Sequence, residues 1–235
     1  MIKLDCRVVV ATWLTAFVCS LSVAHHTGAA ETIELFNQRS LAGWKTMSGG
    51  KVGAGWEVTA DGELHLDRSK GRAGHILSER DVDGDFELKF TWRVAKGGNS
   101  GIKYRVRKYG NQDLGCEFQL LDDKGHRNGR NPKTSAGALY GLFAPHADKQ
   151  LRPVEEYNTS RIVVQGDNLQ HWLNGAKVID IVVGSPEWKK EVAASKFADK
   201  PDFGANRRGK IMLQDHGNDV WFRNVTLILP SASGE

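Results

Sequence analysis

Cysteine is scarce in this chain. Only three occur in 235 residues, and Cys6 and Cys19 both precede residue 30. Cys116 alone remains beyond that point, so the rest of the chain can form no internal disulfide even in an oxidising compartment. A fold without disulfides depends on a packed core, and we expect Cys116 to be a small buried member of that core.

The short motifs of several enzyme classes are also missing. The sequence has no His-x-x-x-His pair and no cysteine pair for zinc, and Asp122-Asp123-Lys124-Gly125 lacks the alternating ligands of a calcium loop. It has no Gly-x-Ser-x-Gly nucleophile motif and no glycine loop for phosphate. We therefore predict no cofactor. A divalent metal assembled from distant strands stays open, because spacing along the chain does not report such a site.

Positive charge is in mild excess, with a net charge of +4. The basic residues are dispersed, apart from a cluster at residues 124–133 that is typical of a solvated loop. A nucleic-acid partner would require a denser basic stripe with interleaved aromatic residues. We therefore expect no nucleic-acid partner.

Long apolar runs are confined to residues 8–23, which follow two basic residues and precede several small ones. This order is typical of a secretory signal peptide, and the run is short for a membrane span. We predict a signal over residues 1–30, cleaved after Ala24 or Ala30, with an uncleaved signal anchor as the alternative. The remainder would be secreted, to the periplasm or outside the cell, with no membrane attachment.

Short strands separated by Gly, Asn and Asp dominate residues 31–235. Apolar and polar residues alternate most clearly over 85–94, and Asn174-Gly175 predicts a two-residue hairpin turn. One helix is expected over 186–197, with Ser185 as N-cap and Pro186 at its first position. We predict a single all-β domain, a two-sheet antiparallel jelly-roll sandwich. The expected strands are 32–36, 56–58, 63–66, 75–78, 85–94, 102–106, 115–123, 138–142, 160–165, 169–173, 176–183, 210–214 and 219–229.

Polar side chains recur at a spacing of two on three of these strands, as a shared strand face requires. The pairs are Lys103 with Arg105, Glu117 with Gln119, and Gln214 with His216. Together they would supply cations, a carboxylate, amides and an imidazole, a set suited to acid–base chemistry. The alternative is a solvent-facing sheet with cross-strand ion pairs, of which Arg105 with Glu117 is the obvious one.

Other polar and aromatic residues have two interpretations each. His171, beside the tight turn, is either structural or within reach of the site, and Tyr140 is either packed or a hydrogen-bond donor to a sugar. Asn158 caps a strand or contacts substrate. Trp172 and Trp221 are expected in the core, with stacking on a sugar as the alternative.

Ordered short motifs extend through almost all of residues 31–229. They include Gly98-Asn99-Ser100-Gly101-Ile102, Glu117-Phe118-Gln119-Leu120-Leu121-Asp122, Gly137-Ala138-Leu139-Tyr140-Gly141-Leu142, His171-Trp172-Leu173-Asn174-Gly175, Ser195-Lys196-Phe197 and Leu213-Gln214-Asp215-His216-Gly217. With these motifs the chain resembles the secreted bacterial family named the 3-keto-disaccharide hydrolase domain, and more widely the concanavalin-A-like lectin/glucanase jelly roll. Tyr157, where that family commonly has Trp, and Met212, in a usually aliphatic strand, depart from the pattern.

The resemblance implies an enzyme that acts on a 3-keto-glycoside, a sugar already oxidised at C3 by a separate dehydrogenase as functional partner. The C3 ketone acidifies the C2 proton. A base removes that proton to give an enolate, and the C1 substituent leaves by β-elimination. Water addition to the resulting enone gives net hydrolysis, whereas stopping earlier makes the enzyme a lyase.

Such a site needs a base near C2, a cation or hydrogen-bond donor at the enolate oxygen and an acid at the leaving oxygen. The resemblance makes His216 or Glu117 the base, and Arg105, with Lys103 behind it, the group that stabilises the enolate. The acid would be Asp122 or Tyr140. The remaining polar candidates would contact the substrate: Gln119, Asn158, His171 and Gln214.

Two other functions are weighed against this one. Glucanases of the same fold have a Glu-x-Asp-x-x-Glu strand, and the corresponding positions here are Glu117, Gln119 and Asp122, so the middle carboxylate is missing. Retaining hydrolysis needs two carboxyl groups about 5–5.5 Å apart, which disfavours direct cleavage of unoxidised glycans. A non-catalytic carbohydrate-binding module is the alternative from another class, because the fold alone does not fix function.

Overall fold

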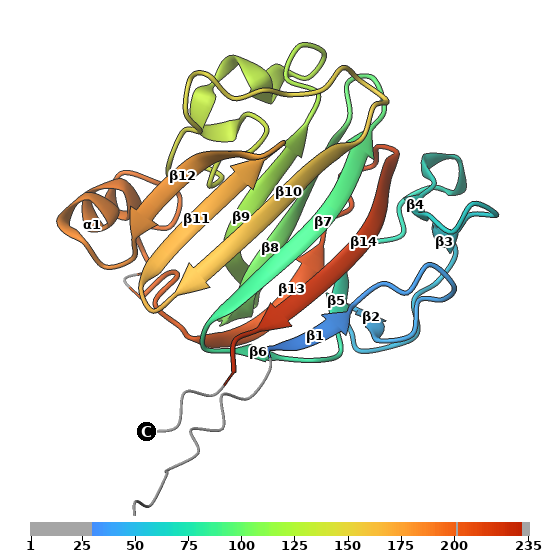
Figure 1. Ribbon diagram of the computed structural model, residues 1–235, viewed down its shortest axis with the longest axis horizontal. Helices are drawn as coiled ribbons and strands as arrows, with labels where there is room; N and C mark the ends of the chain where they lie inside the picture. Colours follow the sequence, from blue (N-terminus) through green and yellow to red (C-terminus); the bar gives the residue numbers. More distant parts are fainter. Residues whose placement is uncertain (1–29, 201, 232–235) are drawn as a thin grey trace, which may run out of the picture.

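The computed structural model describes residues 30–200 and 202–231, and these form two antiparallel β-sheets with one α-helix at their side (Figure 1). The all-β, two-sheet prediction is therefore confirmed. Residues 1–29 of the predicted signal peptide, with the cleavage site after Ala24, lie outside the described residues. No helix in the described part of the chain is long and apolar enough to span a bilayer.

The larger sheet has eight strands in the order β12-β11-β10-β7-β14-β4-β3, with β1 added beside β14. The two chain ends of the domain are neighbours in this sheet, because Glu31 of β1 pairs with Leu229 of β14. Its strands are β1 (Glu31–Glu34), β3 (Trp56–Val58), β4 (Leu64–Leu66), β7 (Phe86–Val94), β10 (Asn158–Gln165), β11 (Asn168–Leu173), β12 (Ala176–Val182) and β14 (Val220–Leu229).

The smaller sheet has six strands in the order β2-β5-β13-β8-β9, with β6 beside β13. Its two longest strands, β8 and β9, form a hairpin, with β9 at the edge of the sheet (Figure 1). The strands are β2 (Trp44–Thr46), β5 (Ile76–Ser78), β6 (Val82–Asp83), β8 (Asn99–Tyr109), β9 (Gln112–Leu121) and β13 (Arg208–Leu213).

The core lies between the two sheets and follows the alternation of the sequence. On β7 the apolar residues of the alternation are all buried, whereas the positions between them are not; the buried residues are Phe86, Leu88, Phe90, Trp92 and Val94. Phe90 of β7 meets Phe118 of β9 edge-on, with ring centroids 5.3 Å apart, so the inner faces of the two sheets touch there. Cys116 is also buried in this core and is free, as predicted. Burial raises the pKa of its thiol to about 12.

The hairpin turn and the helix start are also confirmed. Asn174 and Gly175 have φ angles of 47° and 87°, the left-handed values that a two-residue hairpin turn requires. The helix α1 spans Pro186–Ala193, and the Ser185 side chain accepts a hydrogen bond from the Trp188 N–H. It ends four residues before the predicted 197. The short 3-10 helices are η1 (Arg68–Lys70), η2 (Arg127–Arg130) and η3 (Pro132–Thr134).

The predicted strand at residues 138–142 is wrong. This segment is a turn in which Leu139 makes only isolated bridges, to Phe118 and Phe143. Gly137 and Gly141 have φ angles of 82° and 74°, which break an extended strand at both ends. Strands β2 and β6 were not predicted, because two or three residues are too few to show a periodic pattern.

Candidate active site

Strands β8 and β9 present a polar face that points away from the core. Lys103 pairs with Glu117 in the ladder, and Gly101 pairs with Gln119. Since Phe118 packs into the core, its neighbours on β9 face the other way. Strand β13 lies on the other side of β8 and is followed directly by Gln214. The alternation therefore places side chains from three strands on one face, as predicted.

Gly101 lets the side chains of the two flanking strands meet across β8. Gln214 Nε2 donates a hydrogen bond of 3.2 Å to Glu117 Oε2. A Cβ atom on residue 101 would lie 2.3 Å from Gln214 Oε1 and 2.8 Å from Glu117 Oε1. Any side chain at this position would therefore push the amide and the carboxylate apart.

Glu117 is the only carboxylate that the described part of this face places beside two lysines. Its side chain is buried, and this burial raises the pKa of its carboxyl group, although Lys103, Lys196 and the Gln214 hydrogen bond oppose the shift. A carboxyl group with a raised pKa is a stronger base once it is deprotonated. Glu117 thus has the electrostatic character of a general base.

Lys196 and Tyr140 border Glu117 on the side of α1. Lys196 Nζ lies 4.4 Å from the centre of the Tyr140 ring, and the Tyr140 N–H donates to the Glu117 carbonyl at 3.0 Å. Much of the Lys196 side chain is exposed, yet partial desolvation lowers the pKa of its ammonium, while Glu117 acts in the opposite direction. Burial, and then the charge of Glu117, raises the pKa of the Tyr140 hydroxyl, which makes it a poor acid.

His75 and His216 border the site on the side of β13. Their rings meet edge-on with centroids 6.0 Å apart, and His216 Nε2 lies 3.3 Å from Gln214 Oε1. Burial, then the neighbouring His75 and Lys103, lowers the pKa of His216 to about 4. Burial and Lys103 likewise lower the pKa of His75, whose Nδ1 accepts from the Asp215 N–H at 2.9 Å. His216 is therefore neutral near pH 7.

Arg105 does not belong to this face, and its predicted ion pair with Glu117 is absent. A bulge between Tyr104 and Arg107 breaks the pairing with β9, and Arg105 has a φ angle of 54°. Its guanidinium is buried, with Nη1 3.5 Å from the Gly204 carbonyl. The bulge reverses the alternation, so the cation that accompanies Glu117 is Lys103.

Gln119 lies on the predicted face, where its side chain makes hydrogen bonds to the protein itself. It is almost fully buried, and its Nε2 donates to Asn99 Oδ1 at 2.7 Å and to the Ser100 and Leu120 carbonyls at 3.3 Å. With its amide protons already bonded, Gln119 fixes the start of β8 and has no free donor for a substrate.

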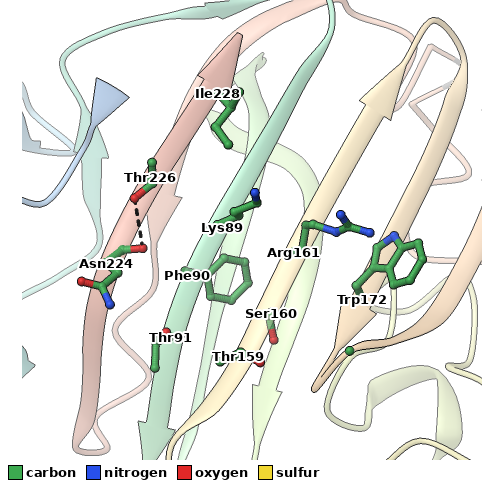
Figure 2. Close-up of a pocket in the computed structure, with 11 residues that line it drawn as sticks. Lys89, Phe90, Thr91, Thr159, Ser160, Arg161, Trp172, Asn224, Thr226 and Ile228 are labelled. Atoms are coloured by element: carbon green, nitrogen blue, oxygen red, sulfur yellow. Dashed lines mark hydrogen bonds between the residues drawn. The ribbon is translucent and has the colours of Figure 1, made fainter. Parts of the chain in front are cut away.

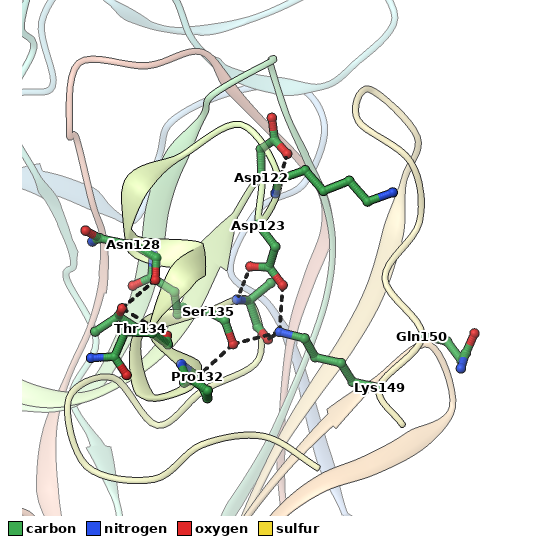
Figure 3. Close-up of polar contacts among 12 residues, drawn as sticks. Asp122, Asp123, Asn128, Pro132, Thr134, Ser135, Lys149 and Gln150 are labelled. Carbon is green, nitrogen blue, oxygen red and sulfur yellow. Dashed lines mark hydrogen bonds and ion pairs between the residues drawn. The ribbon is translucent and has the colours of Figure 1, made fainter. Parts of the chain in front are cut away.

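Asp122 lies outside the cluster because the chain turns after β9. Its Oδ2 accepts from the Gly97 N–H at 2.8 Å, and its Oδ1 accepts from the Gly125 N–H at 3.0 Å. The next residue, Asp123, contacts Lys149 at 2.7 Å, as Figure 3 shows. Asp122 therefore ties two turns together, and the structure does not bring it to Glu117 as an acid.

Asn158 and His171 are also structural. Asn158 Oδ1 accepts from the Arg152 N–H at 3.0 Å and from Asn174 Nδ2 at 2.8 Å. His171 is fully buried between the sheets, where Nε2 lies 2.8 Å from the Tyr104 hydroxyl and Nδ1 lies 3.1 Å from the Gly137 carbonyl. Burial lowers the pKa of His171 to about 3, so it is neutral and closed to substrate.

Three members of the site were missed from the sequence: His75, Lys196 and Gly101. His75 directly precedes β5 and Lys196 follows α1, so neither shares the spacing of two that defined the other candidates. Lys196 and Gly101 were each included in a family motif, Ser195-Lys196-Phe197 and Gly98-Asn99-Ser100-Gly101-Ile102, and these motifs were the only signals for them. A lysine in a loop and a glycine in a strand have no distinctive pattern of their own.

A groove of about 700 Å³ lies elsewhere, on the outer face of the eight-stranded sheet (Figure 2). It contains Trp172, over whose ring the Arg161 guanidinium stacks at 4.1 Å. Trp221 on the same sheet is covered by Arg93 at 4.0 Å and His65 at 4.5 Å. Both tryptophans are thus half-buried on the outer face, and their predicted place in the core is wrong. The residues that line this groove include no carboxylate and no imidazole, in contrast to the Glu117 cluster.

A metal-binding group is not found in residues 30–200 and 202–231, where no three His, Cys, Asp or Glu side chains gather closely enough to hold an ion. In the candidate site the metal-ligand types are Glu117, His75 and His216. Two lysines lie beside the carboxylate.

Comparison with known proteins gives consistent relatives. A curated 3-keto-disaccharide hydrolase from Bacteroides thetaiotaomicron is 30% identical over 224 residues, covering 82% of this chain and 76% of the relative. A solved structure from Parabacteroides distasonis, assigned by its name to the glycosyl hydrolases, is 30% identical with a TM-score of 0.73, over 83% of this chain and 92% of the other.

More distant structures share the fold alone. A Bacillus subtilis protein with a galectin-like fold is 12% identical, with a TM-score of 0.53 over 87% of this chain and 98% of the other. This similarity agrees with a jelly-roll sandwich. Residues 31–228 match the sequence profile of one family over nearly the whole domain. The chain belongs to the 3-keto-alpha-glucoside-1,2-lyase-like domain family.

Proposed function

We propose that this protein cleaves 3-keto-glycosides by removing the C2 proton and eliminating the C1 substituent, with water then added to the enone. That the protein is a hydrolase-class enzyme active on glycosides follows from its family and its curated relative. The order of bond changes is the proposed part. The supporting observation is a buried carboxylate of raised pKa between two lysines, on the outer face of the smaller sheet.

In this mechanism Glu117 takes the proton from C2. A free carboxylate with its usual pKa is a weak base for a carbon acid. The raised pKa of Glu117 makes its carboxylate a stronger base, closer in pKa to the C2 proton that it removes. The Gln214 hydrogen bond holds one carboxylate oxygen and leaves the other to face the sugar. The electron pair of the C2–H bond moves toward C3, and the ketone oxygen becomes an enolate.

The lysines stabilise the negative charge that develops. Lys103, directly opposite Glu117 in the ladder, is assigned to the enolate oxygen, in place of Arg105. When the enolate collapses, the bond between C1 and the leaving oxygen breaks, and that oxygen needs a proton. Lys196 is assigned as the donor, because its lowered pKa makes it a better acid than Tyr140, whose pKa is raised. Water then adds at C1 of the enone, which gives the free 3-keto sugar.

His216 and Gln214 are assigned to sugar binding. A neutral imidazole can both donate and accept a hydrogen bond, as a sugar hydroxyl requires. We also propose that a separate enzyme oxidises the sugar at C3 and so supplies the substrate, because the names of the family and of the curated relative describe a 3-keto sugar. We further propose that the protein acts outside the cytoplasm, on the basis of residues 1–30 of the sequence.

The test is cleavage of p-nitrophenyl 3-keto-glucoside in D₂O. Elimination predicts release of p-nitrophenol and deuterium at C2 of the recovered sugar, and it predicts no cleavage of the unoxidised glucoside. Cleavage without deuterium at C2 would reject the proposed mechanism. Binding of the 3-keto-glucoside without any turnover would instead favour a carbohydrate-binding module.

A further inference from the structure

A positively charged rim borders the candidate site on the side away from Lys196. The rim is the loop that follows η1 and precedes β5. The Asp215 carboxylate binds this loop, because it accepts hydrogen bonds from the N–H groups of Ala73 and Gly74 at 2.8 Å. It also accepts one from the N–H group of Gly217 at 2.7 Å. These bonds hold the loop against the end of β13, next to His216.

Two arginines lie near Gly217, Arg68 of η1 and Arg72 of the loop. Arg68 Nη1 donates to the Gly217 carbonyl, and Arg72 Nε lies 3.9 Å from the position that a Cβ atom on Gly217 would occupy. The Arg72 side chain therefore lies close to Gly217, the residue that directly follows His216. Burial is the main cause of the lowered pKa of His75 and of His216, and the positive charge of Arg72 adds to it at both rings, so Arg72 is within electrostatic range of them.

Asp215 is the carboxylate beside this rim, and its charge opposes that of Arg72 at both histidine rings. Asp215 accepts hydrogen bonds from three backbone N–H groups, whereas within residues 30–200 and 202–231 Arg72 has no ion pair and its guanidinium has no hydrogen bond. The catalytic part of the site also has two lysines for one carboxylate, Glu117. One lysine for the enolate and one for the leaving oxygen account for that pair. Arg72 is then left without a role in bond breaking.

We propose that Arg72 binds an anionic group of the substrate, a carboxylate or a sulfate, next to His216. This inference rests on the proposed function for the identity of the reacting sugar, and adds that the preferred substrate is acidic. Arg72 suits such a group because a guanidinium offers two parallel N–H donors to a carboxylate or sulfate. The anion belongs either to the sugar itself, as a C6 carboxylate, or to the leaving group.

The experiment compares three aryl 3-keto-glycosides: one has no charge, one has a negative charge on the sugar, and one has a negative charge on the leaving group. They are p-nitrophenyl 3-keto-glucoside, which is neutral, p-nitrophenyl 3-keto-glucuronide, which has a charged sugar, and 4-carboxyphenyl 3-keto-glucoside, which has a charged leaving group. We expect kcat/KM to be roughly tenfold higher for one of the two charged substrates than for a neutral substrate whose leaving group is equally reactive, when the salt concentration is low. At high salt the ratio of the two kcat/KM values should be smaller.

The variant Arg72→Gln should lower that preference about tenfold, because it removes the charge and keeps a polar side chain of similar length. Arg39→Gln, at another exposed loop arginine, is the control and should leave the preference unchanged. A wild-type enzyme with no preference for either charged substrate, or an Arg72→Gln variant with an unchanged preference, would overturn the proposal.

Binding of the unoxidised sugars separates this inference from the proposed function. Titration calorimetry with phenyl glucoside, phenyl glucuronide and 4-carboxyphenyl glucoside needs no turnover. If no 3-keto substrate is cleaved but an anionic sugar binds more tightly and Arg72→Gln removes the difference, the proposed function fails and the anion site stands. If all three substrates are cleaved without regard to charge, the function stands and the anion site fails.

Discussion

At the scale of single residues, Glu117 combines a catalytic position with a cost to stability. Its pKa is raised from 4.5, so the folded protein disfavours the ionised form that a base requires. The protonated Glu117 side chain therefore contributes to the free energy of unfolding below about pH 4.5, and this contribution is lost as the pH rises through the raised pKa. As a base it must be ionised, so kcat/KM should rise over the same range of pH.

The variant Glu117→Gln should lose at least 100-fold in kcat/KM on a 3-keto-glucoside, an effect of the size expected for a general base. At neutral pH it should unfold at an equal or higher temperature than the wild type, because a neutral amide replaces a buried charge. The measurements are initial rates and thermal unfolding at pH 4 and pH 8. A variant that stays fully active would remove Glu117 from the mechanism.

Gly101 gives a second prediction at this scale. In Gly101→Ala the new Cβ would collide with Gln214 Oε1 and Glu117 Oε1, so the hydrogen bond between those side chains should be lost. We expect activity to fall at least tenfold and the free energy of unfolding to fall by about 1–3 kcal/mol. Gly53→Ala is the matched control, because a Cβ there meets nothing within 4 Å. Equal effects of the two substitutions would contradict the steric argument.

At the scale of elements, the bulge in β8 decides which cation serves the site. Alternation correctly predicted that Lys103, Glu117 and Gln214 share a face, because regular strands reverse their side chains at every residue. It failed for Arg105 because a bulge shifts the register by one residue, and nothing in the local sequence marks that shift. His75 and Lys196 were missed for another reason, since loops bring them to the sheet from outside the strands.

Substitution of the two cations of β8 tests this assignment. Lys103→Met should lower kcat/KM on a 3-keto-glucoside by 100-fold or more, as for the loss of a donor to an oxyanion. Arg105→Met should lower it by less than about threefold, because the guanidinium lies near Gly204 and away from Glu117. Steady-state kinetics on folded variants, verified by circular dichroism, distinguish the two. The reverse order of effects would show that the bulge is not present in solution.

At the scale of the whole molecule, the two sheets are joined by a polar contact inside an apolar core. Tyr104 belongs to β8 of the smaller sheet and His171 to β11 of the larger sheet, and their side chains meet at 2.8 Å. The two-sheet fold was predictable because strand periodicity recurs throughout the chain. This contact was not, because it depends on which strands face each other across the core.

The contact should make the protein sensitive to acid. The pKa of His171 is lowered from 6.5 to about 3 in the folded state, so its contribution to stability is complete above about pH 6.5 and is lost as the pH falls toward 3. His171→Leu should cost about 2–4 kcal/mol at pH 7, since the Tyr104 hydroxyl and the Gly137 carbonyl lose their partner. Its stability should also depend less on pH between 6.5 and 3. Urea unfolding at several pH values measures both effects, and a variant as acid-sensitive as the wild type would exclude this origin.

The pairing of β1 with β14 has a practical consequence for protein engineering. Since Glu31 and Leu229 are direct neighbours in the ladder, a short linker can join these two points without crossing the polar face of the smaller sheet. New ends can then be opened in an exposed loop such as the one around Gly53. Circular permutation, or insertion of the domain into a host protein, is thus compatible with an intact catalytic face.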